Sequence, residues 1–169
     1  MADPGPIIAD YQTVRVIAGG MLATVYEVVH TMLGQRRFAL KVLRERALSR
    51  WFLRFAKVNA SFPCPDVPTG IVPLYAIGET NGLPYIVMPL IEGDDLCNGI
   101  ADWAARSAEN TAEIIRQVAT TLDFAHGRDI VHGLVHPRHI LQEKGGTVRV
   151  IGFAEWPPQI GRASCRERV

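Results

Sequence analysis

The order of strand-like and helix-like stretches limits the fold more than any other feature of this sequence. Residues 11–20 (YQTVRVIAGG), 23–30 (ATVYEVVH) and 37–43 (RFALKVL) are rich in β-branched and aromatic residues, which predicts an antiparallel three-strand meander. Two further strand candidates, 71–79 and 83–91, are joined by the sequence TNG, which is typical of a tight hairpin turn. Between the third and fourth strands, residues 47–62 have helix-like spacing.

A long amphipathic helix is predicted within residues 107–129, after an EGDD stretch whose following residues are also helical in character. Ser107 or Asn110 could cap it, and its apolar positions share one face: Ile114, Val118, Leu122 and Ala125. Two short strand candidates, 139–144 and 147–153, follow around a Gly-Gly turn. Five strands with one inserted helix, followed by a mainly helical part, predict an α+β fold in two lobes.

Composition places the chain among soluble globular proteins. Of its 169 residues, 48% are hydrophobic and 21% are charged, and the net charge is +1, so we expect neither a nucleic-acid partner nor membrane contact within this chain. Residues 1–10 lack the pattern of a signal peptide. The three cysteines are widely spaced and odd in number, which favours free thiols and a cytoplasmic location.

Five motifs occur in order along the chain: IAGGMLATVY, FALKVL, GIVPLYAIGETNGLPYIVMPLIEGDDL, IVHGLVHPRHIL and VRVIGF. They resemble, at the expected separations, the phosphate loop, the lysine strand, the strand pair leading to the hinge, the catalytic loop and the strand before the metal triplet of bacterial serine/threonine protein kinases. The resemblance covers about Tyr11 to Trp156. It implies a protein-kinase-like two-lobe fold, with a complete five-strand N-lobe carrying one helix and a partial helical C-lobe.

The resemblance also sets the expected boundaries. Residues 1–10 are a flexible lead, 11–91 the N-lobe, and 92–160 a partial C-lobe. Residues 161–169 (GRASCRERV) have no apolar period, and we treat them as an artefactual tail, so that the natural protein is expected to continue beyond Ile160. The amphipathic helix would then expose an apolar face that includes Ile115, Leu122 or Phe124.

The nucleotide-binding positions of the family are partly kept. The phosphate-loop pattern G-x-G-x-x-G-x-V reads Ala18, Gly20, Ala23 and Val25, while the nucleotide lysine is present as Lys41. The glutamate that pairs with this lysine is replaced by Phe55. The resemblance implies nucleotide contacts at these residues: Gly20, Val25, Ala39, Lys41, Met88 as gatekeeper, Pro89 and Ile91 in the hinge, and Leu141 below the adenine.

The catalytic positions of the family are lost. In the loop H-R-D-L-x-x-x-N, Leu134 stands where the catalytic aspartate would be and His139 where the metal-binding asparagine would be, while His136 replaces a frequent lysine. The metal triplet D-F-G begins with Gly152. His132 and Phe153 keep positions that stack in active kinases. No intact catalytic residue and no metal site is therefore expected, and the spacing of the three histidines is not that of a standard zinc site.

The leading functional hypothesis is a pseudokinase that serves binding or regulation, holds ATP without magnesium and acts on an unidentified protein partner. Two alternatives stay open. The segment HGLVHPRHIL also resembles the H-G-D-x-H-P-x-N loop of small-molecule kinases such as aminoglycoside phosphotransferases. In the other alternative, an active kinase uses His136 or His139 in place of a carboxylate.

Overall fold

The computed structural model describes residues 7–20, 22–34, 36–44, 56–57, 70–98 and 107–153. The chain divides into two compact units, the first comprising residues 1–60 and 73–90 and the second residues 61–72 and 91–169. Most of the helix predicted at 47–62, including Phe55, and the whole of 154–169 lie outside the described residues, although residues 56–57 are helical.

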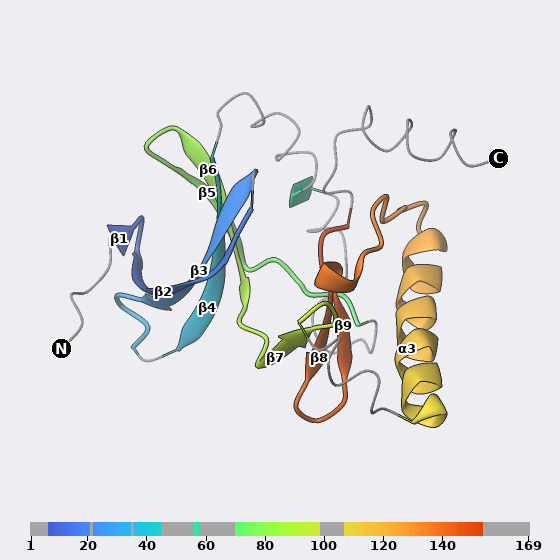
Figure 1. Ribbon diagram of the computed structural model, residues 1–169. Coiled ribbons are helices and arrows are strands. Elements are labelled where there is room, and N and C mark those ends of the chain that lie inside the picture. The colour runs from blue at the N-terminus through green and yellow to red at the C-terminus, as the bar shows by residue number, and fades with distance from the viewer. Residues whose placement is uncertain are drawn as a thin grey trace. The chain divides into compact units, whose positions relative to one another are not determined.

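The first unit contains an antiparallel sheet of six described strands (Figure 1). The strand order is β1-β2-β3-β4-β6-β5, and every neighbouring pair is antiparallel. Its strands are β1 (Ile7–Ile8), β2 (Tyr11–Gly19), β3 (Ala23–His30), β4 (Arg37–Leu43), β5 (Ala76–Thr80) and β6 (Leu83–Pro89). The predicted meander and strand pair are therefore confirmed.

Three details differ from the sequence prediction. The short β1 pairs with β2 inside a stretch that was expected to be a mobile lead. The fourth predicted strand begins only at Ala76, because Ile71 forms an isolated parallel bridge to Val150 of the second unit's sheet. Residues 93–95, within the EGDD stretch, form a strand that the sequence did not predict. The predicted TNG turn is confirmed, and the positive φ angles of Asn81 (50°) and Gly82 (75°) suit a tight hairpin.

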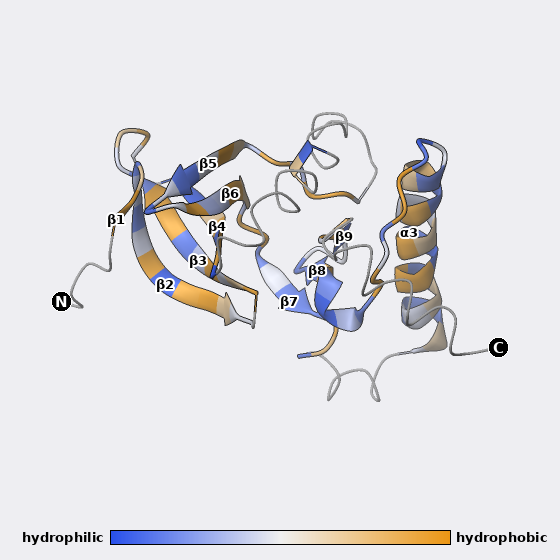
Figure 2. Ribbon diagram, turned by 90° about the horizontal axis from the view of Figure 1, so that it is seen from above, coloured by the Kyte–Doolittle hydropathy of each residue, from blue (hydrophilic) through white to orange (hydrophobic). Residues whose placement is uncertain are grey.

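Bands of hydrophilic and hydrophobic residues run along β2 and β3 (Figure 2), and successive side chains of a strand point to opposite faces of the sheet. One face carries an apolar cluster of Val28, Phe38, Leu40, Val42 and Val87. The other carries a cluster of Ala23, Leu43, Ala56 and Ile86, with Met88 packed against it. A slip of one residue would move these buried side chains to the opposite face, so the register of β3, β4 and β6 is strongly specified.

The second unit combines the helix α3 (Ala108–His126) with a sheet in the order β7-β8-β9. Its strands are β7 (Gly93–Asp95), β8 (Ile140–Glu143) and β9 (Val148–Val150), and a 3-10 turn, η2 (Pro137–His139), precedes β8. Of the two predicted caps, Ser107 is the one used, since its hydroxyl accepts a hydrogen bond from the Asn110 N–H at 3.2 Å. Ile114 and Ala125 are buried, as predicted.

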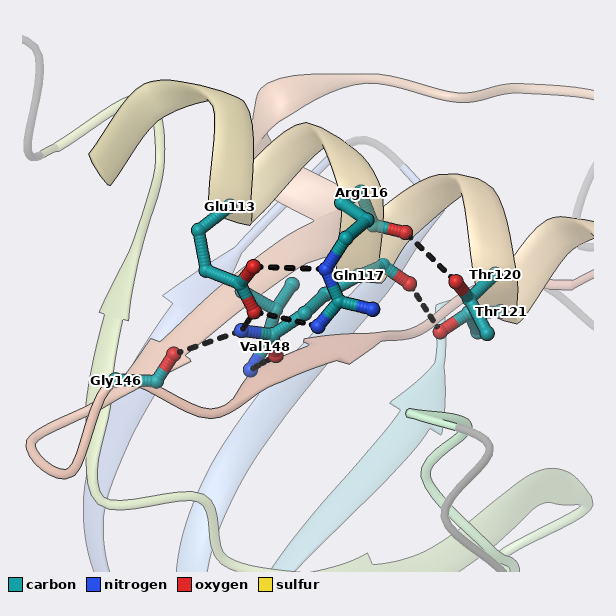
Figure 3. A network of polar contacts seen from close by, with 7 residues as sticks. All are labelled: Glu113, Arg116, Gln117, Thr120, Thr121, Gly146 and Val148. Atoms are coloured by element: carbon teal, nitrogen blue, oxygen red, sulfur yellow. Dashed lines mark hydrogen bonds and ion pairs between the residues drawn. The ribbon is translucent and has the colours of Figure 1, made fainter. Parts of the chain in front are cut away.

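Polar groups fasten α3 to the β8–β9 hairpin (Figure 3). The Gln117 Oε1 accepts the Val148 N–H at 2.8 Å, while its Nε2 donates to Glu113 at 2.9 Å. The buried Thr121 donates to the Gln117 carbonyl, and Gly70 lies so close to it that an added Cβ would overlap the Thr121 hydroxyl. The side-chain amide of Gln117 thus joins α3 to the backbone of β9.

The outer side of α3 is less apolar than expected. Ile115 is 60% exposed, as predicted. Leu122 and Phe124 instead pack against the cluster of Ile71, Ala125, Val150 and Phe153. Within the described part of the chain, no helix has both the length and the apolar character that crossing a membrane would require.

Candidate functional site

Four of the predicted nucleotide contacts lie on one face of the first unit's sheet. Residues paired directly across neighbouring strands share a face, and the register places Val25 opposite Lys41 and Ala39 opposite Met88. Lys41 also pairs with Ile86 on the neighbouring strand, and Ala39 also pairs with Glu27. We call Val25, Ala39, Lys41 and Met88 the strand-face residues. The sequence pattern therefore selected side chains that the fold brings together.

Lys41 provides the amine of this face. Its side chain is half-buried, and burial lowers its pKa from 10.5 to about 8. The physical cause is desolvation, which disfavours the charged ammonium relative to the neutral amine. At pH 7 the group still carries its charge for most of the time, so it can bind an anion such as a phosphate.

Sequence reasoning missed a buried carboxylate on the same face. Glu27 is 1% exposed and is held by two guanidinium groups, Arg15 at 2.7 Å and Arg37 at 3.0 Å. Both arginine side chains are largely exposed. The strand period could have flagged Glu27, because it follows Ala23 and Val25 at intervals of two along β3. One carboxylate shared by two cations leaves this end of the face with a net positive charge.

Two other predicted contacts of the first unit lie elsewhere. Pro89 pairs with Phe38, which is on the opposite face from the strand-face residues. Gly20 lies in the turn between β2 and β3, where its N–H donates to the Ala23 carbonyl at 2.9 Å. An added Cβ at Gly20 would make an ordinary contact of 3.7 Å to that oxygen. Space therefore does not require a glycine at this position.

The remaining predicted contacts, Ile91 and Leu141, belong to the second unit. Leu141 pairs with Asp95 and Arg149, so it lies on the sheet face opposite Ile140, Val148 and the α3 core. Ile91 precedes β7, and its carbonyl accepts a hydrogen bond from Gly93 at 3.2 Å. Both side chains are half-buried.

The loop that resembles a catalytic loop is built around His132. This imidazole is 1% exposed, and its Nε2 lies 3.0 Å from the Ile151 carbonyl. Its ring packs on Phe153 with centroids 4.7 Å apart, as the resemblance implied. Burial, ahead of the charge of His139, lowers the pKa of His132 from 6.5 to about 4. The ring is therefore neutral at physiological pH.

Leu134, His136 and His139, which stand at the family's catalytic-loop positions, make local hydrogen bonds. Leu134 donates its N–H to the Nδ1 of His132 at 3.3 Å. His139 Nδ1 lies 2.9 Å from the Leu134 carbonyl. The exposed His136 caps η2, where its Nδ1 accepts the Arg138 N–H at 3.2 Å. No group of three potential metal ligands gathers anywhere among residues that the structure describes.

Two glycines in this region hold backbone conformations that side chains disfavour. Gly133 has φ +83° and Gly152 has φ +85°. In family terms they occupy the positions of the catalytic-loop arginine and the metal-binding aspartate. For a residue with a Cβ, the left-handed region costs roughly 1–2 kcal/mol. Gly133 and Gly152 thus adopt backbone conformations that favour glycine, at positions where the family has an arginine and an aspartate.

Comparison with known proteins places these features in a family. The family model for protein tyrosine and serine/threonine kinases matches residues 11–154. The chain is 34% identical over 160 residues to a probable serine/threonine-protein kinase PknB of Lactococcus lactis, covering 90% of this chain and 25% of the relative. It is 32% identical over 148 residues to the serine/threonine-protein kinase PrkC of Bacillus subtilis, covering 85% and 22%. It thus spans about a quarter of the length of these relatives.

Solved structures agree with this assignment. The kinase domain of Mycobacterium tuberculosis PknI superimposes with a TM-score of 0.72 at 26% identity, covering 93% of this chain and 64% of that one. Rad53 residues 1–466, in complex with AMP-PNP, superimposes with a TM-score of 0.73 at 26% identity, covering 85% and 38%. Sequence motifs, sheet register and these likenesses lead to one conclusion: the chain belongs to the protein tyrosine and serine/threonine kinase family and is related to the bacterial serine/threonine kinases.

Proposed function

We propose that this kinase-related chain binds a nucleotide such as ATP without needing magnesium, that it does not transfer the phosphoryl group, and that it acts by regulating a protein partner. The observation that carries the proposal is the state of the catalytic loop. Its backbone is held by specific hydrogen bonds at His132 and His139, yet Leu134 and Gly152 provide no carboxylate. Phosphoryl transfer in this family depends on an aspartate to position the acceptor and on metal ligands to neutralise charge.

The nucleotide part of the proposal is supported by the first unit. The strand-face residues combine apolar side chains suited to an adenine ring with the amine of Lys41, whose remaining positive charge suits a phosphate. A structural relative, Rad53 residues 1–466, was solved in complex with the ATP analogue AMP-PNP. We expect the same class of ligand here.

Thermal unfolding of the purified chain with ATP tests the binding. A ligand at a hundred times its Kd stabilises the folded state by about 2.7 kcal/mol. We expect ATP to raise Tm equally in magnesium and in EDTA, and Lys41→Met to abolish the rise. Lys144→Met is the matched control, because Lys144 is an exposed lysine in the β8–β9 turn. A rise that requires magnesium would argue for retained metal chemistry, and no rise at all would argue for a pure scaffold.

Transfer from labelled ATP to a generic protein substrate tests the second part. We expect no transfer above that of the Lys41→Met variant. Transfer that disappears in Lys41→Met would refute inactivity. If transfer disappears in His139→Asn as well, which keeps a donor at this position, the imidazole itself is required, and the altered-chemistry alternative is favoured.

A further inference from the structure

Four hydrogen bonds in the second unit form a closed ring through two imidazoles. The Leu134 N–H donates to His132 Nδ1 at 3.3 Å, and His132 Nε2 meets the Ile151 carbonyl at 3.0 Å. The Ile151 N–H donates to the His139 carbonyl at 2.9 Å, and His139 Nδ1 meets the Leu134 carbonyl at 2.9 Å. Both backbone groups of Leu134 are thereby held, one by each histidine.

The partners decide the tautomers of both rings. A carbonyl oxygen only accepts and a backbone N–H only donates. His132 must therefore carry its hydrogen on Nε2 and present a lone pair on Nδ1. His139 must carry a hydrogen on Nδ1 in order to donate to Leu134. The two rings lie 5.8 Å apart with 30° between their planes.

The geometry of the His139 side chain explains why this position tolerates an imidazole. In histidine, Nδ1 is two bonds from Cβ, through Cγ. In asparagine, the family's usual residue here, Nδ2 is also two bonds from Cβ through Cγ. An Nδ1–H of histidine and an N–H of asparagine can therefore reach the same acceptor position, while the imidazole provides none of the hard oxygen that magnesium prefers.

We infer that His139 is a positioning residue, whose Nδ1–H replaces the amide of an asparagine and fixes the backbone of Leu134 against Ile151. These hydrogen bonds thus hold the loop backbone in place although the family's catalytic side chains are absent. Gly133, with φ +83° next to Leu134, supplies the turn that brings this backbone within reach of both rings. The inference rests on the loop alone, so it and the proposed nucleotide binding can fail independently.

Three substitutions of one position test the inference. His139→Asn keeps a donor two bonds from Cβ, His139→Asp has the same shape without a donor at neutral pH, and His139→Leu has neither charge nor donor. The measurement is hydrogen exchange of the Leu134 amide by NMR in the full chain. We expect exchange in His139→Asn to match the unsubstituted protein. In His139→Asp and His139→Leu, exchange should be roughly tenfold faster, because losing the bond from His139 to the Leu134 carbonyl lets the loop open and releases the Leu134 N–H from His132.

An internal reference separates local loosening from global unfolding. The Val148 amide, held by Gln117 in the same unit, should exchange at an unchanged rate in all variants. Equal Leu134 protection in His139→Asp and His139→Asn would overturn the inference, as would faster exchange in His139→Asn. Should His139→Asp unfold the unit, ring ¹⁵N shifts of the unsubstituted chain decide: the inference requires the hydrogen of His139 on Nδ1, and a ring protonated only on Nε2 would refute it.

Discussion

The pH dependence of stability offers the sharpest test of how the loop is held, and His132 contributes to it through a shifted pKa. Its folded pKa of about 4 lies below its ordinary value of 6.5, so between these values the unfolded chain binds more protons than the folded one. The stabilisation that comes from a neutral His132 is present above pH 6.5 and is lost as the pH falls toward 4. Protonation would also remove the Nδ1 lone pair that accepts the Leu134 N–H.

The size of the effect follows from the two pKa values. Proton linkage makes folding roughly 2 kcal/mol less favourable at pH 5 than at pH 7 through this one residue, and about 3 kcal/mol less favourable below pH 4. Other groups titrate in the same range, so the measurement must be a difference between two proteins. His132→Phe keeps a ring beside Phe153 and removes the titrating group.

The assay is urea unfolding of the chain and of His132→Phe at pH 7 and pH 5. At pH 7 the variant should be less stable, because the Leu134 N–H and the Ile151 carbonyl lose their partners at about 1–3 kcal/mol each. At pH 5 the gap between the two proteins should shrink by roughly 2 kcal/mol. A gap that stays constant or widens would refute the reasoning. If His132→Phe does not fold, an NMR titration of His132 with a midpoint of 6 or above would refute it equally.

Three further predictions concern the sheet faces and α3. Gly70→Ala should destabilise the chain by about 2–4 kcal/mol in urea unfolding, because Gly70 has φ +68° and a Cβ would overlap Thr121; a change below 1 kcal/mol would show that the packing is loose. Glu27→Gln should cost about 1–2 kcal/mol, since two charge-assisted bonds become weaker neutral ones; an unchanged unfolding midpoint would contradict this. Acylation of Lys41, followed by peptide mass spectrometry, should be half-maximal near pH 8 and slowed by ATP; a midpoint above pH 10 would contradict burial as the cause.

Strand and helix positions could be predicted from the sequence because they depend on local periodicity. The alternation in ATVYEVVH and RFALKVL predicts two paired strands, and their observed register brings Val25 and Lys41 together. The Asn-Gly turn and the capped amphipathic helix are equally local, since each depends on residues a few positions apart. The absence of a carboxylate at Leu134 and Gly152 is likewise readable from the sequence alone.

Contacts between distant residues were decided only by the tertiary structure. No sequence period indicates that Ile71 leaves its predicted strand to bridge Val150, or that Arg15 and Arg37 converge on a buried Glu27. The hydrogen bonds of His132 and His139 were also decided only by the tertiary structure. His132 and His139 look like remnants of a catalytic motif in the sequence, but the structure places their ring nitrogens on the backbone of Leu134 and Ile151. Hydrogen bonds depend on distances of about 3 Å and on direction, and those are set by how the whole unit packs.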